Sequence, residues 1–214
     1  MRRRKTTSKR MALLTDIQGL STNGNIVGMI YKFSQTIPGY NWTIENGTLG
    51  VSENAGTGLY NKRTGMVTTT FDPSKFTNST DLGIARVILH EGVHAYLQAY
   101  FGSAISSGKT YNDLIIMYLD DFGNTGTTQH NLMVTAFRED IGHALEEYGA
   151  SKGYTMLPGY YQDLAWGGLM KTTTYTDLSQ TDKDRIYSRL TTEQYGVDKD
   201  GNPSTQLGAA TNCP

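Results

Sequence analysis

Two histidines and a glutamate lie within five consecutive residues, His90-Glu91-Gly92-Val93-His94. If this stretch is helical, His90 and His94 lie one turn apart on the same face, so both imidazoles can bind one metal ion. Glu91 is turned by about 100° around the helix axis, which lets its carboxylate reach a water molecule at the metal without being a ligand. The motif therefore predicts a metal-activated hydrolase with Glu91 as general base.

The segment around the motif has the pattern of a buried central helix. Residues 82–101 are apolar on nearly every side, and the polar interruptions are mainly Arg86, His90, Glu91, His94 and Gln98. Because burying two imidazoles and a carboxylate without partners is costly, we favour metal binding over a pair of core histidines. Residues 78–81 supply helix-capping side chains, and Gly102 marks the end. Gly92 in mid-helix costs about 1 kcal/mol relative to alanine, which predicts that another element packs closely there.

A catalytic zinc ion needs a third protein ligand and an open position for water. Residues 129–148 form a second predicted helix, and His130 projects onto the centre of its apolar face. That face consists of Met133, Phe137, Ile141, Ala144, Leu145 and Tyr148. We therefore predict His130 as the third ligand. Two alternatives stay open: Glu147 as a carboxylate ligand, and Asp140 as a carboxylate that orients an imidazole.

The other acidic and basic groups of this helix are predicted to face solvent. On the same helical wheel Glu139, His143 and Glu146 point away from the apolar face. The oxyanion of the transition state needs a further donor, and among the 14 tyrosines Tyr160 and Tyr161 are candidates.

The rest of the chain predicts an α+β fold that is mainly helical. Residues 23–35 and 182–195 have helical periodicity, whereas residues 40–51 and 65–71 are rich in β-branched or alternating apolar residues. We expect a small sheet beside the metal helix. Met66–Phe71 is the candidate for an edge strand that receives the substrate backbone, and the alternative is that it is an ordinary strand of the sheet. Trp166 is predicted to be a core aromatic beneath the site.

Composition limits the classes of site and partner. The single cysteine, Cys213, excludes a disulfide framework and a zinc site made of thiolates. No run of about 20 apolar residues is present, so no membrane span is expected. Residues 1–10 hold six of the 19 basic residues, which leaves residues 11–214 with 13 basic and 20 acidic residues and a net charge of −7. A nucleic-acid-binding surface on the folded body is therefore not expected.

The domain organisation follows from the same patterns. We expect a basic, disordered tail over residues 1–12, a metallopeptidase domain over 13–196 and a flexible tail over 197–214, where turn residues occur without periodicity. The apolar run after the basic residues is too short for a signal peptide. The expected location is cytoplasmic, or outside the cell after export by a specialised route.

These motifs resemble those of SprT-like zincin metallopeptidase domains. The resemblance covers roughly residues 60–190 and rests on four stretches: His90-Glu-Gly-Val-His-Ala-Tyr-Leu97, Gln129-His-Asn-Leu-Met133, Ala144-Leu-Glu-Glu-Tyr148 and Asp163-Leu-Ala-Trp-Gly-Gly-Leu169. Such domains occur in bacteria of the Bacteroidetes type, in Rhs-like polymorphic toxins and phage-associated proteins. The resemblance implies a zincin-like fold, one catalytic zinc ion held by His90, His94 and His130, and Glu91 as base.

The expected activity is hydrolysis of a protein or peptide substrate. A toxin or effector domain is one setting for this activity, and an immunity protein is a further expected partner if the domain is a toxin. Two alternatives remain. One is a catalytically silent binding module with the zincin fold, although retention of Glu91 argues against decay. The other is a regulatory SprT-like protease acting on DNA-associated proteins, which the acidic body and the lack of a zinc ribbon disfavour.

Overall fold

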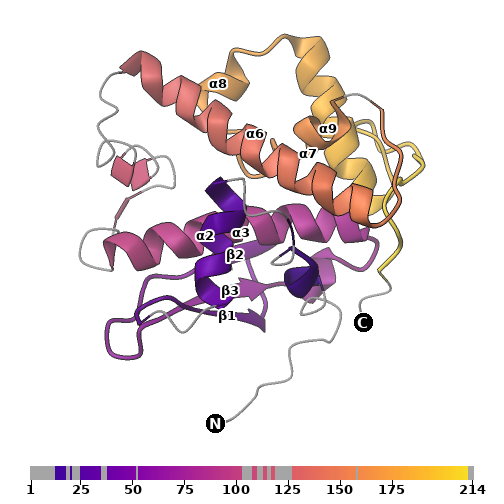
Figure 1. Cartoon of the computed structure of the whole chain (residues 1–214). Helices are drawn as coiled ribbons and strands as arrows, with labels where there is room; N and C mark the ends of the chain where they lie inside the picture. The colour runs from indigo at the N-terminus through magenta and orange to yellow at the C-terminus, as the bar shows by residue number, and fades with distance from the viewer. Residues whose placement is uncertain are drawn as a thin grey trace.

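The computed structural model describes residues 13–17, 20, 25–34, 38–51, 53–102, 108–109, 113–114, 117–118, 127–157 and 159–211, with backbone alone for residues 25, 34 and 127–136. The fold is α+β, as predicted, with three layers (Figure 1). A small sheet forms one side, helices α2 (Asn25–Tyr31) and α3 (Asp81–Phe101) lie in the middle, and α6 (Thr127–Ser151) crosses over α3. Helices α7 (Tyr160–Leu164) and α8 (Thr173–Thr176) pack against α6, and α9 (Gln180–Tyr195) packs against α7 and α3.

The sheet has the strand order β1-β3-β2, and its topology corrects one prediction. Strand β3 (Met66–Phe71) pairs in parallel with β1 (Asn41–Asn46) on one side and antiparallel with β2 (Ala55–Thr57) on the other. The prediction that Met66–Phe71 is the edge strand is therefore wrong, because both of its edges are already paired. The edge beside α3 belongs to β2, which the sequence analysis missed.

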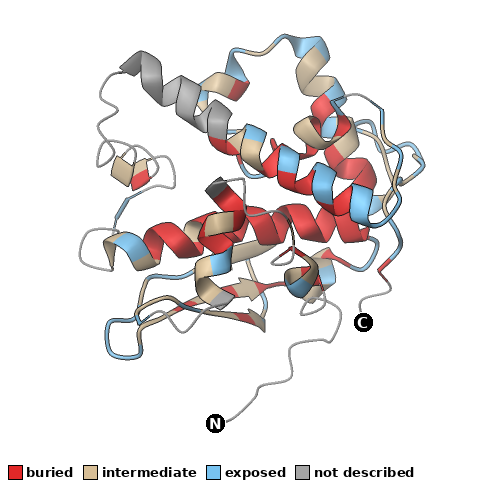
Figure 2. Ribbon diagram, in the orientation of Figure 1, coloured by how far each residue is buried: buried red, intermediate tan, exposed pale blue. Residues whose placement is uncertain are grey.

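Helix α3 is the core of the molecule. Residues 81–93 are all buried, and the helix remains buried as far as Gln98 except at His94 (Figure 2). Thr80 caps the start by accepting a hydrogen bond from the Gly83 amide, and Gly102 ends the helix, both within the predicted limits. The close packing predicted at Gly92 is confirmed: a Cβ there would lie 2.7 Å from Ile30 of α2 and 3.4 Å from Trp42 of β1.

Helix α6 presents the predicted apolar face to α3. Phe137, Ile141, Ala144, Leu145 and Tyr148 are all buried. The polar residues predicted to point outward do so, since the side chains of Glu139, His143 and Glu146 are 53%, 69% and 64% exposed. Helical periodicity thus predicted the orientation of this helix correctly over its described side chains.

Residues 197–211 differ from the predicted flexible tail. They form a turn closed by the bridge between Val197 and Pro203, and then run beside the start of α3, where Thr80 pairs with Ala210. The predicted basic tail, residues 1–12, lies outside the described residues. No helix in the described part of the chain is both long and apolar enough to cross a lipid bilayer.

Candidate metal centre

His90 and His94 bring their imidazoles together on one face of α3. Their Nε2 atoms lie 3.1 Å apart, and the ring planes meet at 69°. Two imidazole nitrogens bound at about 2.0–2.1 Å to one tetrahedral ion lie roughly 3.3 Å apart. Two nitrogen atoms that face each other at such a distance share either a proton or a cation. The pair therefore fits the first two ligands of a metal ion.

The surroundings keep both rings neutral, which is the form that binds metals. Burial lowers the pKa of His90 well below its usual value, and the nearby His94 and Arg86 lower it further. Burial lowers the pKa of His94 to about 4. Both imidazoles are therefore uncharged at neutral pH, and each neutral ring has one nitrogen that can accept.

The loop after α7 forms the wall against His90. Gly168 has a φ of +90°, and a Cβ there would lie 2.5 Å from Cε1 and 2.6 Å from Nε2 of the His90 ring. A side chain at this position would occupy the space of the imidazole. Trp166, two residues earlier, is buried, as predicted for a core aromatic beneath the site.

Glu91 lies at the end of a hydrogen-bond chain that leads back into the sheet. The Thr57 hydroxyl lies 2.6 Å from Oε2 of Glu91 and 2.7 Å from the Thr69 hydroxyl, which accepts a 2.8 Å hydrogen bond from the Trp42 indole. Burial raises the pKa of Glu91 to about 7, although Thr57 and Arg86 oppose the rise. The sheet thus fixes a carboxylate of unusually high proton affinity next to His90.

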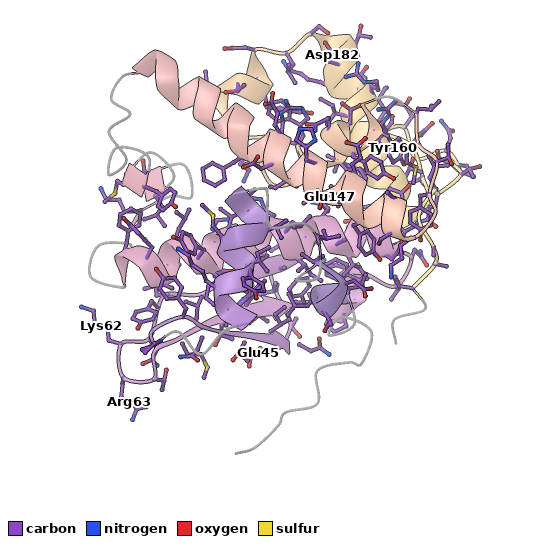
Figure 3. All side chains as sticks on the ribbon, viewed as in Figure 1. Glu45, Lys62, Arg63, Glu147, Tyr160 and Asp182 are labelled. Carbon is purple, nitrogen blue, oxygen red and sulfur yellow. The ribbon has the colours of Figure 1, made fainter. Side chains whose placement is uncertain are left out.

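The predicted third ligand falls partly outside the described residues. The backbone of His130 belongs to α6, but its side chain is not described. Among the described side chains, no third His, Cys, Asp or Glu joins the two histidines in a group that could hold a metal ion. Glu147 lies on α6 and is exposed (Figure 3), and Asp140 is partly buried there. His130 therefore stays the predicted third ligand.

A cavity of about 460 Å³ opens beside the motif. His90, Glu91 and Arg86 of α3 line it together with residues of three other segments: Glu53, Asn54 and Ala55; Gly167, Gly168, Met170 and Lys171; and Tyr187, Leu190, Gln194 and Tyr195. The predicted base, Glu91, and the predicted ligand, His90, thus lie at the wall of one cavity, where a bound molecule can contact both.

Strand β2 borders this cavity with an unpaired edge. In an antiparallel ladder every second residue of a strand bonds to the neighbouring strand. The hydrogen bonds from Gly58 N to Thr68 O and from Asp72 N to Asn54 O show that residues 54, 56 and 58 face β3. The N–H and C=O groups of Ala55 and Thr57 therefore point away from β3. No backbone hydrogen bond among the described residues occupies those groups. Because Ala55 also lies at the cavity wall, this edge is a candidate position for an extended peptide.

The predicted oxyanion donors lie elsewhere. Tyr160 is buried and donates its hydroxyl to Glu193 (Figure 3), and neither Tyr160 nor Tyr161 lines the cavity. The tyrosines that do are Tyr187 and Tyr195 of α9, both 45% exposed.

Comparison of this chain with protein-family models, curated proteins and solved structures returned no match.

Proposed function

We propose that the protein is a zinc-dependent metalloendopeptidase of the zincin type, with His90, His94 and His130 as zinc ligands and Glu91 as general base. The observation that carries the proposal is the pair of neutral imidazoles whose Nε2 atoms lie 3.1 Å apart, beside a buried carboxylate at a cavity wall. Neutral imidazoles one helical turn apart are a common pair of zinc ligands, and a carboxylate beside them can act as general base.

The substrate binds as an added strand along β2. An extended peptide pairs with the free peptide groups of Ala55 and Thr57, as edge strands commonly allow. Because Thr57 also hydrogen-bonds Glu91, this pairing places the peptide backbone beside the catalytic carboxylate. Recognition through main-chain groups suits an enzyme that acts on protein chains.

Glu91 moves the proton in the reaction. It takes a proton from the attacking water and passes it to the leaving amine, and a pKa near neutrality suits both transfers. A bound zinc ion would supply the Lewis acid that activates the water and polarises the scissile carbonyl. Thr57 holds Oε2 of Glu91, so the other carboxylate oxygen is left for the water.

The experiment combines metal analysis with cleavage of a panel of denatured proteins. We expect the wild type to bind one zinc ion per chain and to cleave the panel. Glu91→Gln should keep the zinc and lose activity, whereas His130→Ala should lose most of the metal. His143→Ala, at an exposed histidine of the same helix, is the matched control and should behave as wild type.

Three results would overturn the proposal or a part of it. Stoichiometric zinc in His130→Ala would refute that ligand and make Glu147 the next candidate. A wild-type protein that neither binds zinc nor acquires it on addition would refute the metallopeptidase. Zinc binding without cleavage of any protein or peptide, in wild type and variants alike, would favour a binding module.

A further inference from the structure

Arg86 is a buried cation whose partners in the protein are few. It lies one turn before His90 on α3, and the residue is 8% exposed. Its one hydrogen bond among the described residues runs from Nη2 to Oε1 of Gln194, at 3.3 Å. Burial lowers its pKa to about 10, so the guanidinium stays charged at neutral pH.

Two other arginines, both more exposed than Arg86, pair with a buried carboxylate. Arg185 and Arg189 both donate to the buried carboxylate of Asp163, at 2.8 and 2.9 Å. No such carboxylate lies within ion-pair distance of Arg86 among the described residues. Glu91, the carboxylate whose charge acts on Arg86, is hydrogen-bonded to Thr57. An unpaired buried cation is costly, which indicates that Arg86 meets its anion in a bound ligand.

An anion bound in the cavity can contact Arg86, because this residue forms part of the cavity wall. The guanidinium lines it, and a Cβ on Gly167 would lie only 2.7 Å from its Cζ, so the glycine backbone packs against the guanidinium without covering it with a side chain. Val87, Met170 and Leu190 provide apolar walls, and Lys171 adds a second cation. A short aliphatic stem that ends in a carboxylate matches these surroundings.

We propose that Arg86 binds a carboxylate of the substrate in this cavity and thereby selects the cleavage site. Positions four apart on a helix are separated by about 6 Å along the axis. Arg86 can therefore contact the substrate residue that adjoins the scissile bond at His90, or the residue after that one. Its planar fork of donors suits a carboxylate, which it binds through two parallel hydrogen bonds. This inference rests on the proposed function, because it identifies the substrate class of the same site.

Binding is measured first, without cleavage. The zinc-loaded Glu91→Gln protein is titrated with matched peptides that carry Glu or Gln at one internal position. A second pair has neutral side chains and ends in a carboxylate or an amide. We expect at least one acidic peptide to bind about 30-fold more tightly than its neutral match. The first pair reports an acidic side chain, and the second reports a chain terminus.

The variants assign the preference to Arg86. Adding Arg86→Met to the Glu91→Gln protein should abolish the preference for the acidic peptide. Adding Arg86→Lys instead should reduce this preference, because lysine keeps the positive charge but lacks the two parallel N–H donors of arginine. Arg63→Met, at an exposed arginine of the β2–β3 turn (Figure 3), is the control and should keep the full preference. Equal binding of both members in each peptide pair, or a preference that survives Arg86→Met, overturns the inference. The peptide comparison in the Glu91→Gln parent tests it even if Arg86→Met does not fold.

The two proposals fail in distinguishable ways. If the wild type cleaves nothing but the Arg86-dependent carboxylate preference is found, the metallopeptidase fails and the carboxylate site stands. If the wild type cleaves peptides at equal kcat/KM with and without the carboxylate, the metallopeptidase stands and the carboxylate site is refuted.

Discussion

Two buried polar clusters lie along helix α3, and they differ in how many hydrogen bonds their carboxylates accept. At its first turn, the capping cluster consists of Asp81 and Glu193 with their donors. Asp81 accepts hydrogen bonds from the amides of Leu82 and Ala209 and from the hydroxyls of Tyr148 and Tyr154. Glu193 accepts from the hydroxyls of Thr80 and Tyr160 and from the amides of Leu207 and Gly208.

The second cluster, two turns further along, consists of Arg86, His90, Glu91 and His94. Glu91 accepts one side-chain hydrogen bond among the described residues, from Thr57, and burial raises its pKa to about 7. Arg86 has one neutral partner, and the two imidazoles face each other. A carboxylate whose acceptor sites are filled by the protein holds structure together, whereas one left short of donors can take up a proton or contact a ligand.

The comparison is tested most strongly by the same substitution in each cluster. Glu91→Gln should lower kcat by about 10²–10⁴-fold with little change in stability, because it removes the proposed general base. Glu193→Gln should leave kcat of the folded protein near wild type and lower the free energy of unfolding by roughly 2–4 kcal/mol, because it leaves buried donors unpaired. Urea denaturation and steady-state assays on both variants separate the two effects. If both substitutions lower kcat alone, or both lower the free energy of unfolding alone, the two clusters do not have different roles.

The next largest effect is expected at the wall of the site. Gly168→Ala should lower zinc affinity by about 10–100-fold, because the new methyl group displaces the His90 ring from its orientation. Gly201→Ala is the matched control: its φ of +84° imposes similar backbone strain, but a Cβ there meets nothing within 4 Å. Competition with a chromophoric chelator measures the affinity. Equal zinc affinity in the two variants would show that Gly168 does not shape the metal centre.

The sequence predicted those parts of the fold that local periodicity determines. The limits of α3, the two longer strands, α9 and the described buried face of α6 follow from apolar spacing, and the pair of histidines follows from helix geometry alone. Strand β2 was missed because Ala55-Gly56-Thr57 is too short to show alternation. Its position between β3 and α3 depends on pairing with a distant segment.

The parts of the site that could not be predicted come from contacts between distant segments. Thr57 of β2 and Gly168 of the loop after α7 contact the motif, but neither lies in a segment with a periodic apolar pattern. In the sequence, Arg86 differs from its neighbours only as a charged residue in an apolar helix. Residues 197–211 have turn chemistry, as expected, but their order depends on Glu193 and Asp81, which accept hydrogen bonds from their amides. Such partners become visible only when the tertiary fold is known.

A smaller effect is expected where the sheet contacts the base. Thr57→Val removes the hydroxyl that holds Glu91 and keeps the shape of the side chain, so kcat should fall by roughly 10-fold, as expected for one hydrogen bond to a charged group. Thr43→Val on β1, whose hydroxyl contacts the sulfur of Met66, is the control and should leave kcat unchanged. Unchanged kcat in Thr57→Val, measured at saturating peptide, would mean that Glu91 is positioned by other contacts.

The smallest effect concerns the capping cluster at high pH. Burial and the hydrogen bond to Asp81 raise the pKa of Tyr154 to about 12. Because the folded protein holds this proton more tightly than the unfolded chain, its contribution to stability is complete below about pH 10 and is lost as the pH rises toward 12. Tyr154→Phe should therefore be less stable by about 1 kcal/mol at pH 8, with a shallower decline in stability between pH 10 and 12. Urea denaturation across this pH range measures the free energy of unfolding, and Tyr31→Phe, at an exposed tyrosine, is the control. If the stability of Tyr154→Phe declines as steeply as that of the wild type between pH 10 and 12, the proton on Tyr154 is not linked to folding.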